Sequence, residues 1–175
     1  MPLSEPWLRG PLPSVGPLVS NLYYTFAQAR EELVAALSGL TVGEIWSRPH
    51  GLASVGFHVR HMGGAAERLG CYLLNAPLTA EQLREMKAEA EPGASGDELL
   101  TQLEARFERL ERDVQAIDQA RLEEAREVGR ARLPSTAIGL IVHIAEHTQR
   151  HLGQAVTMAK LVKALRDESG SGPAA

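Results

Sequence analysis

The 175-residue sequence contains a single cysteine, Cys71, so no disulfide can form within the chain. This sparse use of cysteine agrees with a reducing compartment, and we expect a cytoplasmic protein. No basic side chain stands at a spacing from Cys71 that would let it deprotonate the thiol. We therefore interpret it as an incidental residue and not as a nucleophile.

The sequence also lacks a strong excess of charge and a long apolar segment. Its 18 basic and 22 acidic residues give a formal net charge of -4, and no basic run is longer than two residues. This composition does not favour a nucleic-acid partner, which would call for a basic patch or stripe. The proline-rich N-terminal segment fits neither a signal peptide nor a membrane span, and we expect no membrane partner.

The length suits one domain with a sizeable core. We expect a proline-rich extended arm over residues 1–16, packed on the body through Trp7 and Leu8. A folded body over 17–166 and a disordered tail over 167–175 follow, because the tail is rich in Gly, Ser and Pro.

Four stretches of the body place apolar residues at helical spacing. They cover about residues 17–38, 54–74, 95–119 and 136–166. Ser54 and Ser95 stand at the starts of two of them as N-caps, and Ser135 follows Pro134 as a cap for the last.

The connections between these helices include two long ones, over about 75–94, which has a short helical stretch at 80–90, and over about 121–134. No segment shows a convincing strand pattern. Four amphipathic helices joined in this way predict an all-α fold, a four-helix bundle with long crossover connections. Metal and ligand sites in such bundles are built from side chains on facing helices.

Three histidines recur at every fourth residue of the last predicted helix, namely His143, His147 and His151. On a helix they form one column, with successive rings about 6 Å apart along the axis. Neighbouring members of the column can bind one metal ion, whereas His143 and His151 are about 12 Å apart. The apolar arc of the helix contains His151, has His147 near its edge and leaves His143 just outside. We therefore take His147 and His151 as the inward pair.

A catalytic metal site usually has three protein ligands and one open position, so a third ligand has to come from another helix. His58 and His61 lie one turn apart on the inward half of the second predicted helix, and helical periodicity leaves either usable. The simpler interpretation is that the inward histidines are hydrogen-bonded residues of a helix interface. Two histidines at ligand spacing, with others on a second helix, favour the metal site.

Two other metal constellations fit poorly. The carboxylate-bridged di-iron bundle needs Glu-x-x-His on two helices, and no histidine of this sequence follows a glutamate by three residues. The string from His143 through Glu146 to His147 matches the inverted zinc-peptidase motif. Periodicity, however, places Glu146 on the polar face, and peptidases of that type are far larger. Three imidazoles suit zinc, nickel, iron or copper, so the donor set does not identify the ion.

The segments SVGFHVRHM (54–62) and HIAEHTQRHLGQ (143–154) resemble the DinB-like superfamily of metal-dependent bacterial proteins, and the resemblance covers about residues 15–165. It implies a four-helix bundle in which His61, His147 and His151 bind a divalent metal such as zinc, nickel or iron. It also implies that His58 and His143 occupy positions where histidine is tolerated without being a ligand. A homodimer is common in that family.

The resemblance implies a function less sharply than a fold. The wider superfamily includes thiol-dependent S-transferases, a mycothiol-dependent isomerase and domains of enzymes that make sulfur-containing histidine derivatives. This implies a metal-dependent enzyme that transfers a low-molecular-weight thiol to a small-molecule substrate, or a hydrolase. The alternative is a non-catalytic bundle that binds or senses a metal or small ligand. The lack of a fourth protein ligand favours the enzyme, and the absence of an obvious general base favours the alternative.

Overall fold

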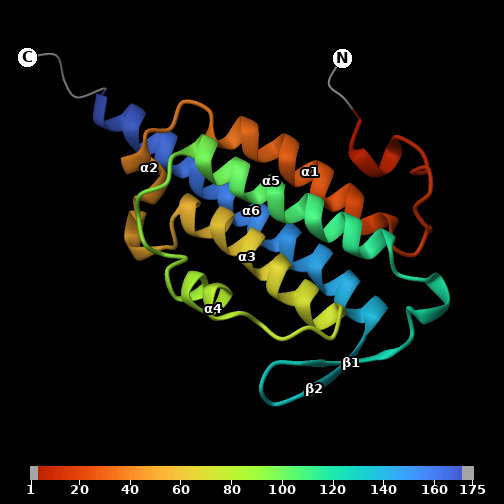
Figure 1. Cartoon of the computed structure of the whole chain (residues 1–175). Coiled ribbons are helices and arrows are strands. Elements are labelled where there is room, and N and C mark those ends of the chain that lie inside the picture. The colour runs from red at the N-terminus through yellow and green to blue at the C-terminus, as the bar shows by residue number, and fades with distance from the viewer. Residues whose placement is uncertain (1–3, 171–175) are drawn as a thin grey trace, which may run out of the picture.

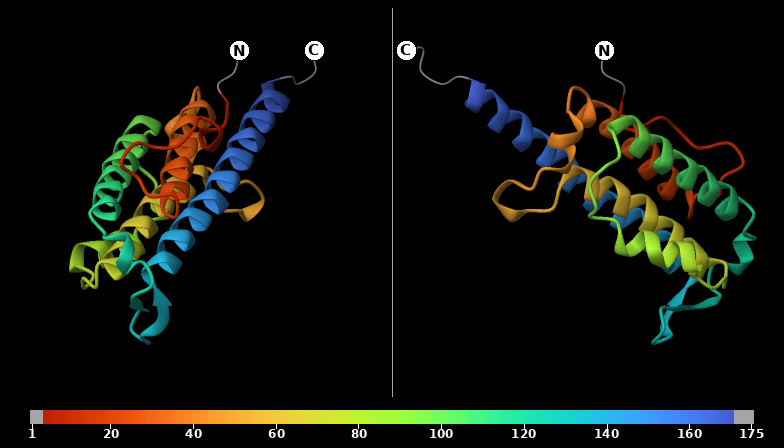
Figure 2. Two further views of the ribbon diagram at one scale, coloured as in Figure 1. Left: turned by 90° about the vertical axis from the view of Figure 1, so that its right-hand side faces the viewer. Right: turned by 60° about the vertical axis from the view of Figure 1, so that its left-hand side comes forward.

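The computed structural model describes residues 4–170, which form six α-helices and one two-stranded sheet. The helices are α1 (Ser20–Leu37), α2 (Val42–Trp46), α3 (Val55–Leu73), α4 (Ala80–Lys87), α5 (Gly96–Gln115) and α6 (Ala137–Gly170). The four long helices lie side by side, with α3 packed on α5 and α6, and α1 packed on the same two helices (Figures 1 and 2). The predicted all-α bundle is confirmed.

The core of the bundle lies where the apolar faces of the long helices meet. Phe26 of α1 and Phe107 of α5 are fully buried, and their rings stack with centroids 3.7 Å apart. Five of the six apolar positions that predicted α5 are buried on it, and they are Leu99, Leu103, Phe107, Leu110 and Val114. The sixth, Ile117, lies beyond the end of the helix at Gln115 and is partly buried. The 3.6-residue period therefore identified the inward faces correctly.

Side-chain caps fix the starts of α3, α5 and α6. The Ser54 hydroxyl accepts a hydrogen bond from the Phe57 N–H at 3.1 Å and so begins α3, which carries His58 and His61. Ser95 forms the predicted capping box with Glu98 at the start of α5. For α6 the expected cap at Ser135 is wrong by one residue, because the Thr136 hydroxyl accepts from the Gly139 N–H at 3.1 Å.

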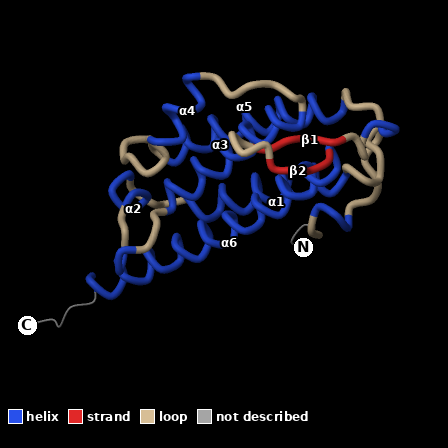
Figure 3. The backbone as a smooth tube through the Cα atoms, turned by 90° about the horizontal axis from the view of Figure 1, so that it is seen from below, coloured by secondary structure: helices blue, strands red, loops and turns tan. Residues whose placement is uncertain are grey.

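The connection between α5 and α6 contains a β-hairpin that the sequence pattern did not predict. Strand β1 (Ala125–Val128) pairs antiparallel with β2 (Leu133–Thr136), as Figure 3 shows in red. Its turn uses Gly129 and Arg132, both at positive φ. The buried Arg126 side chain donates to the Leu73 carbonyl at 2.6 Å and ties the hairpin to the end of α3. Because the inward residue of β1 is charged, the strand lacks the alternation of apolar and polar residues from which strands are predicted.

The two ends of the chain also differ in detail from expectation. A short 3₁₀ helix (Pro6–Leu8) interrupts the N-terminal arm, whose Trp7 and Leu8 are exposed. The arm is held instead by Arg9, whose guanidinium pairs with Glu31. Helix α6 continues past 166 to Gly170, and residues 171–175 of the predicted tail lie outside the described part of the chain. No helix among the described residues is long and apolar enough to cross a membrane.

Candidate metal centre

Facing turns of α3 and α6 bring three of the histidines together. The ring centroid of His61 lies 5.1 Å from that of His147 and 4.5 Å from that of His151. The rings of His147 and His151, one turn apart on α6, are 4.5 Å apart. Each residue offers one ring nitrogen, and these three atoms lie within 4.8 Å of one another. The residues predicted as ligands therefore meet in space, and their binding of an ion stays a prediction.

The donor set fits a divalent cation. On a tetrahedral zinc ion with Zn–N bonds of about 2.0–2.1 Å, neighbouring nitrogens stand about 3.3 Å apart. Rings whose nitrogens lie within 4.8 Å of one another reach that spacing by small side-chain rotations. His61, His147 and His151 are all partly exposed, so a small molecule can approach the cluster.

The electrostatic environment keeps the rings of His147 and His151 neutral. Burial, with a further contribution from His61, lowers the pKa of His147 to about 4. The same two causes, burial first, lower the pKa of His151 to about 4. At neutral pH both rings therefore carry a free lone pair, which is the form that binds metal.

A buried carboxylate contacts the third ring. Glu89 Oε2 lies 2.6 Å from His61 Nδ1, and Arg68 Nη1 lies 2.7 Å from Glu89 Oε1. Burial opposes ionisation of Glu89, but the hydrogen bond from His61 and the ion pair with Arg68 outweigh it and lower its pKa. Because Nδ1 of His61 is engaged in this way, its Nε2 is the atom left for an ion.

Sequence reasoning did not find Glu89. It lies in the connection after α4, 28 residues beyond His61, where helical periodicity gives no information. The only available signal was an acidic residue in a connection rich in acidic residues, which is not specific.

His58 and His143 lie beside the cluster in different ways. His58 is buried, and its Nδ1 lies 3.1 Å from Nδ1 of His151. Burial, with His61 as a second cause, lowers the pKa of His58. His143 is exposed and pairs with Glu146 at 3.2 Å on the outer face of α6. The predicted outward positions of His143 and Glu146 are thus confirmed, and this geometry does not support a peptidase motif.

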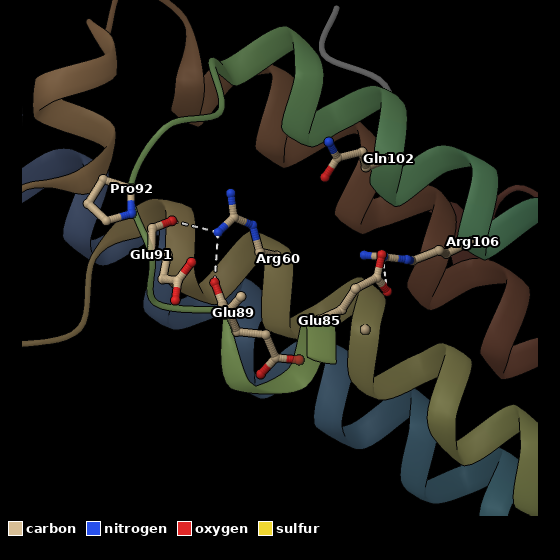
Figure 4. A pocket seen from close by; sticks show the side chains of 9 residues that line it. Arg60, Glu85, Glu89, Glu91, Pro92, Gln102 and Arg106 are labelled. Carbon is tan, nitrogen blue, oxygen red and sulfur yellow. Dashed lines mark hydrogen bonds and ion pairs between the residues drawn. The ribbon is translucent and has the colours of Figure 1, made fainter. Parts of the chain in front are cut away.

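A polar cavity of about 280 Å³ adjoins the carboxylate on the side of α5 (Figure 4). Arg60, Gly64, Glu85, Glu89, Gln102 and Arg106 line it. No histidine of the described residues 4–170 lines it, so the cavity borders Glu89 and not the three rings themselves.

Comparisons with known proteins agree with this site. The sequence model of the family described as the DinB superfamily matches residues 25–155. The chain belongs to the DinB superfamily. The matched range of this DinB superfamily protein includes all three clustered histidines.

No curated protein matches the chain. Among solved structures, it is similar to one described as "Crystal structure of the conserved protein of locus from Enterococcus faecalis", with a TM-score of 0.71. The two sequences are 19% identical, and the match covers 86% of this chain and 99% of the other. At that identity the likeness shows the fold alone.

Proposed function

We propose that this DinB superfamily protein is a metal-dependent enzyme that acts on a small molecule from an ion held by His61, His147 and His151. The observation that carries the proposal is the meeting of three imidazole donors within 4.8 Å. Three protein ligands leave at least one coordination position open, whereas structural sites are usually closed by four. When bound, a divalent ion of this kind lowers the pKa of a thiol or water molecule at the open position.

Transfer of a low-molecular-weight thiol is the reaction that we favour over hydrolysis. Among the described residues, Glu89 is the carboxylate that bonds a ring of the cluster, and it is already engaged by His61 and Arg68. It is therefore not free to serve as a general base. A thiol coordinated to a metal loses its proton outright and needs no such base, which supports the transferase.

The test is an assay of thioether formation between a cysteine-derived thiol and an aromatic chloride electrophile, with metal-free protein and with protein loaded with zinc, nickel or iron. We expect turnover in a loaded sample only, lost in His147→Ala. His143→Ala is the matched control, because it removes an exposed histidine from the same helix one turn away. Turnover that persists without metal, or in His147→Ala, would exclude this mechanism. Wild-type protein that binds metal but never turns over would also count against an enzyme.

A non-catalytic metal-binding or sensing bundle is the second candidate. The observation that favours it is His58, a buried fourth ring whose Nδ1 lies 3.1 Å from that of His151. Rotation of this ring into the coordination sphere would close the site. Cobalt(II)-loaded protein distinguishes the two candidates, because an open site gains a thiolate-to-metal absorption band when thiol is added and a closed one does not.

The homodimer that the family resemblance implies and the cytoplasmic location that the low cysteine content suggests are also part of this proposal. Light scattering of the purified protein measures the oligomeric state. Fractionation of the source cells measures the location.

A further inference from the structure

Hydrogen bonds fix the backbone on both sides of Glu89, although this residue lies in the irregular connection between α4 and α5. The Glu91 N–H donates to the Ala88 carbonyl at 3.0 Å and closes a turn around it. Arg60 of α3 donates through Nη1 to the same Ala88 carbonyl at 3.0 Å and to the Glu91 carbonyl at 2.6 Å. Both flanks of Glu89 are therefore fastened to the helix that carries His61, as Figure 4 shows for Arg60.

Arg60, which bonds both ends of this turn, is itself positioned by Trp46 of α2. The Arg60 guanidinium lies over the Trp46 ring, 4.4 Å from its centroid, and the Trp46 indole N–H donates to the Ala94 carbonyl at 2.8 Å. The negative face of an aromatic ring attracts such a cation. The connection from α4 to α5 is thus fixed at Ala88, Glu91 and Ala94.

The side chain of Glu89 is directed by α3 as well. In Figure 4 its carboxylate points away from Arg60. There it meets Arg68 and His61 at 2.7 and 2.6 Å. Space for the Glu89–Arg68 pair exists because residue 64 is glycine: a Cβ there would lie 2.8 Å from Glu89 Oε1 and 2.9 Å from Arg68 Nη1.

We propose that Glu89 is a positioning residue of the metal centre, which accepts a hydrogen bond from the protonated Nδ1 of His61 and so presents the Nε2 lone pair to the ion. A carboxylate can only accept, so the 2.6 Å contact makes Nδ1 the protonated nitrogen of His61. A neutral imidazole has one N–H. When that N–H is at Nδ1, Nε2 keeps the lone pair that can bind a metal ion. The role toward the ion rests on the proposed metal site, whereas the choice of tautomer does not.

Zinc affinity of the full-length protein, measured by competition with a chromogenic chelator, tests the role toward the ion. Loss of an outer carboxylate costs about 10–100-fold in metal affinity, and we expect a loss in that range for Glu89→Ala. For Glu89→Gln, which keeps the size but not the charge, we expect about tenfold. Glu91→Gln is the matched control, because it removes an exposed carboxylate two residues away. Wild-type affinity in both Glu89 variants would overturn the proposal.

A second variant displaces Glu89 without changing any charge. Gly64→Ala introduces the Cβ that crowds Glu89 and Arg68, in a helix interior where alanine is otherwise favoured over glycine. We expect zinc affinity to fall several-fold. Gly153→Ala on α6 is the control, since a Cβ there meets nothing within 4 Å, and its affinity should equal that of the wild type. A wild-type affinity in Gly64→Ala together with both Glu89 variants would refute the role.

Nitrogen-15 NMR of the histidine rings in metal-free protein separates this proposal from the proposed function. We expect His61 as the Nδ1–H tautomer in the wild type and a shift toward the Nε2–H form in Glu89→Ala. Should Glu89→Ala fail to fold by circular dichroism, Glu89→Gln replaces it. Failure of the wild type to bind any metal would contradict the proposed function while leaving this measurement decisive. A His61 tautomer that is the same in Glu89→Ala as in the wild type would overturn the role of Glu89 and leave the proposed function untouched.

Discussion

The Nδ1 atoms of His58 and His151 face each other at 3.1 Å. A hydrogen bond between them needs one donor and one acceptor, so the two rings cannot both be protonated at these atoms. If His151 binds an ion through Nε2, its Nδ1 carries the proton and donates a hydrogen bond to Nδ1 of His58. On this reading His58 supports a ligand and does not bind the ion itself.

This contact predicts that His58→Gln keeps its metal. We expect about one ion per chain, as in the wild type, with an affinity reduced by about tenfold because an outer hydrogen-bond partner of His151 is altered. Elemental analysis and chelator competition measure the two quantities. Loss of the metal from His58→Gln to the same extent as from His151→Ala would instead make His58 a fourth ligand.

The metal-free protein should lose stability as the pH falls. The folded-state pKa values of His147 and His151 are about 4, below the ordinary value of 6.5. Below pH 6.5 the unfolded chain therefore binds protons that the folded chain does not, and the free energy of unfolding falls until the pH reaches about 4. Thermal unfolding between about pH 7.5 and about pH 4.5 should show a falling Tm. The slope should be shallower in His147→Gln, and equal slopes would contradict these pKa shifts.

The cap of α3 predicts a modest loss of stability. Ser54→Ala removes the acceptor of the Phe57 N–H and should lower the free energy of unfolding by about 1 kcal/mol. Ser38→Ala is the control, because Ser38 is exposed at the C-terminal end of α1 and bonds the Val34 carbonyl through its backbone N–H, which alanine keeps. Its change should stay within about 0.5 kcal/mol. Urea denaturation of both variants checks the difference. Equal stabilities would show that the cap contributes nothing.

The stacked pair in the core predicts a larger loss. Phe107→Ala removes a fully buried ring that packs face to face on Phe26, and core truncations of this kind cost about 3–5 kcal/mol. Phe107→Leu keeps much of the volume and should cost clearly less. Urea denaturation measures both. A loss below about 1 kcal/mol for the alanine variant would mean that the core closes around the gap.

Much of the bundle follows from local rules of the sequence. The period of buried residues such as Phe107 predicted the long helices, and Ser54 and Ser95 predicted two of their starts. The same period separated His147 and His151 from the exposed His143, because all three share one helix of known geometry. The packing of α3 on α6 brings a histidine of α3 to this pair. Periodicity left His58 and His61 equally usable, and the choice of His61 came from the family resemblance.

The support of the site could not be predicted in this way. Glu89 lies in an irregular connection and contacts His61 because a turn and the hydrogen bond from Arg60 to the Ala88 carbonyl fix its position. The contact between His58 and His151 depends on the offset of two helices along their axes, which periodicity does not specify. The hairpin is anchored by the charged Arg126 on a backbone carbonyl, an interaction with no apolar pattern.

Elemental analysis of the protein purified without a histidine tag or a chelating column tests the metal centre most directly, with His61→Ala, His147→Ala and the control His143→Ala beside the wild type. We predict about one divalent ion per chain in the wild type and in His143→Ala, and none in the two cluster variants. Wild-type protein that holds no ion, even after incubation with zinc, nickel and iron, would contradict the metal centre and leave the three histidines as residues of a helix interface.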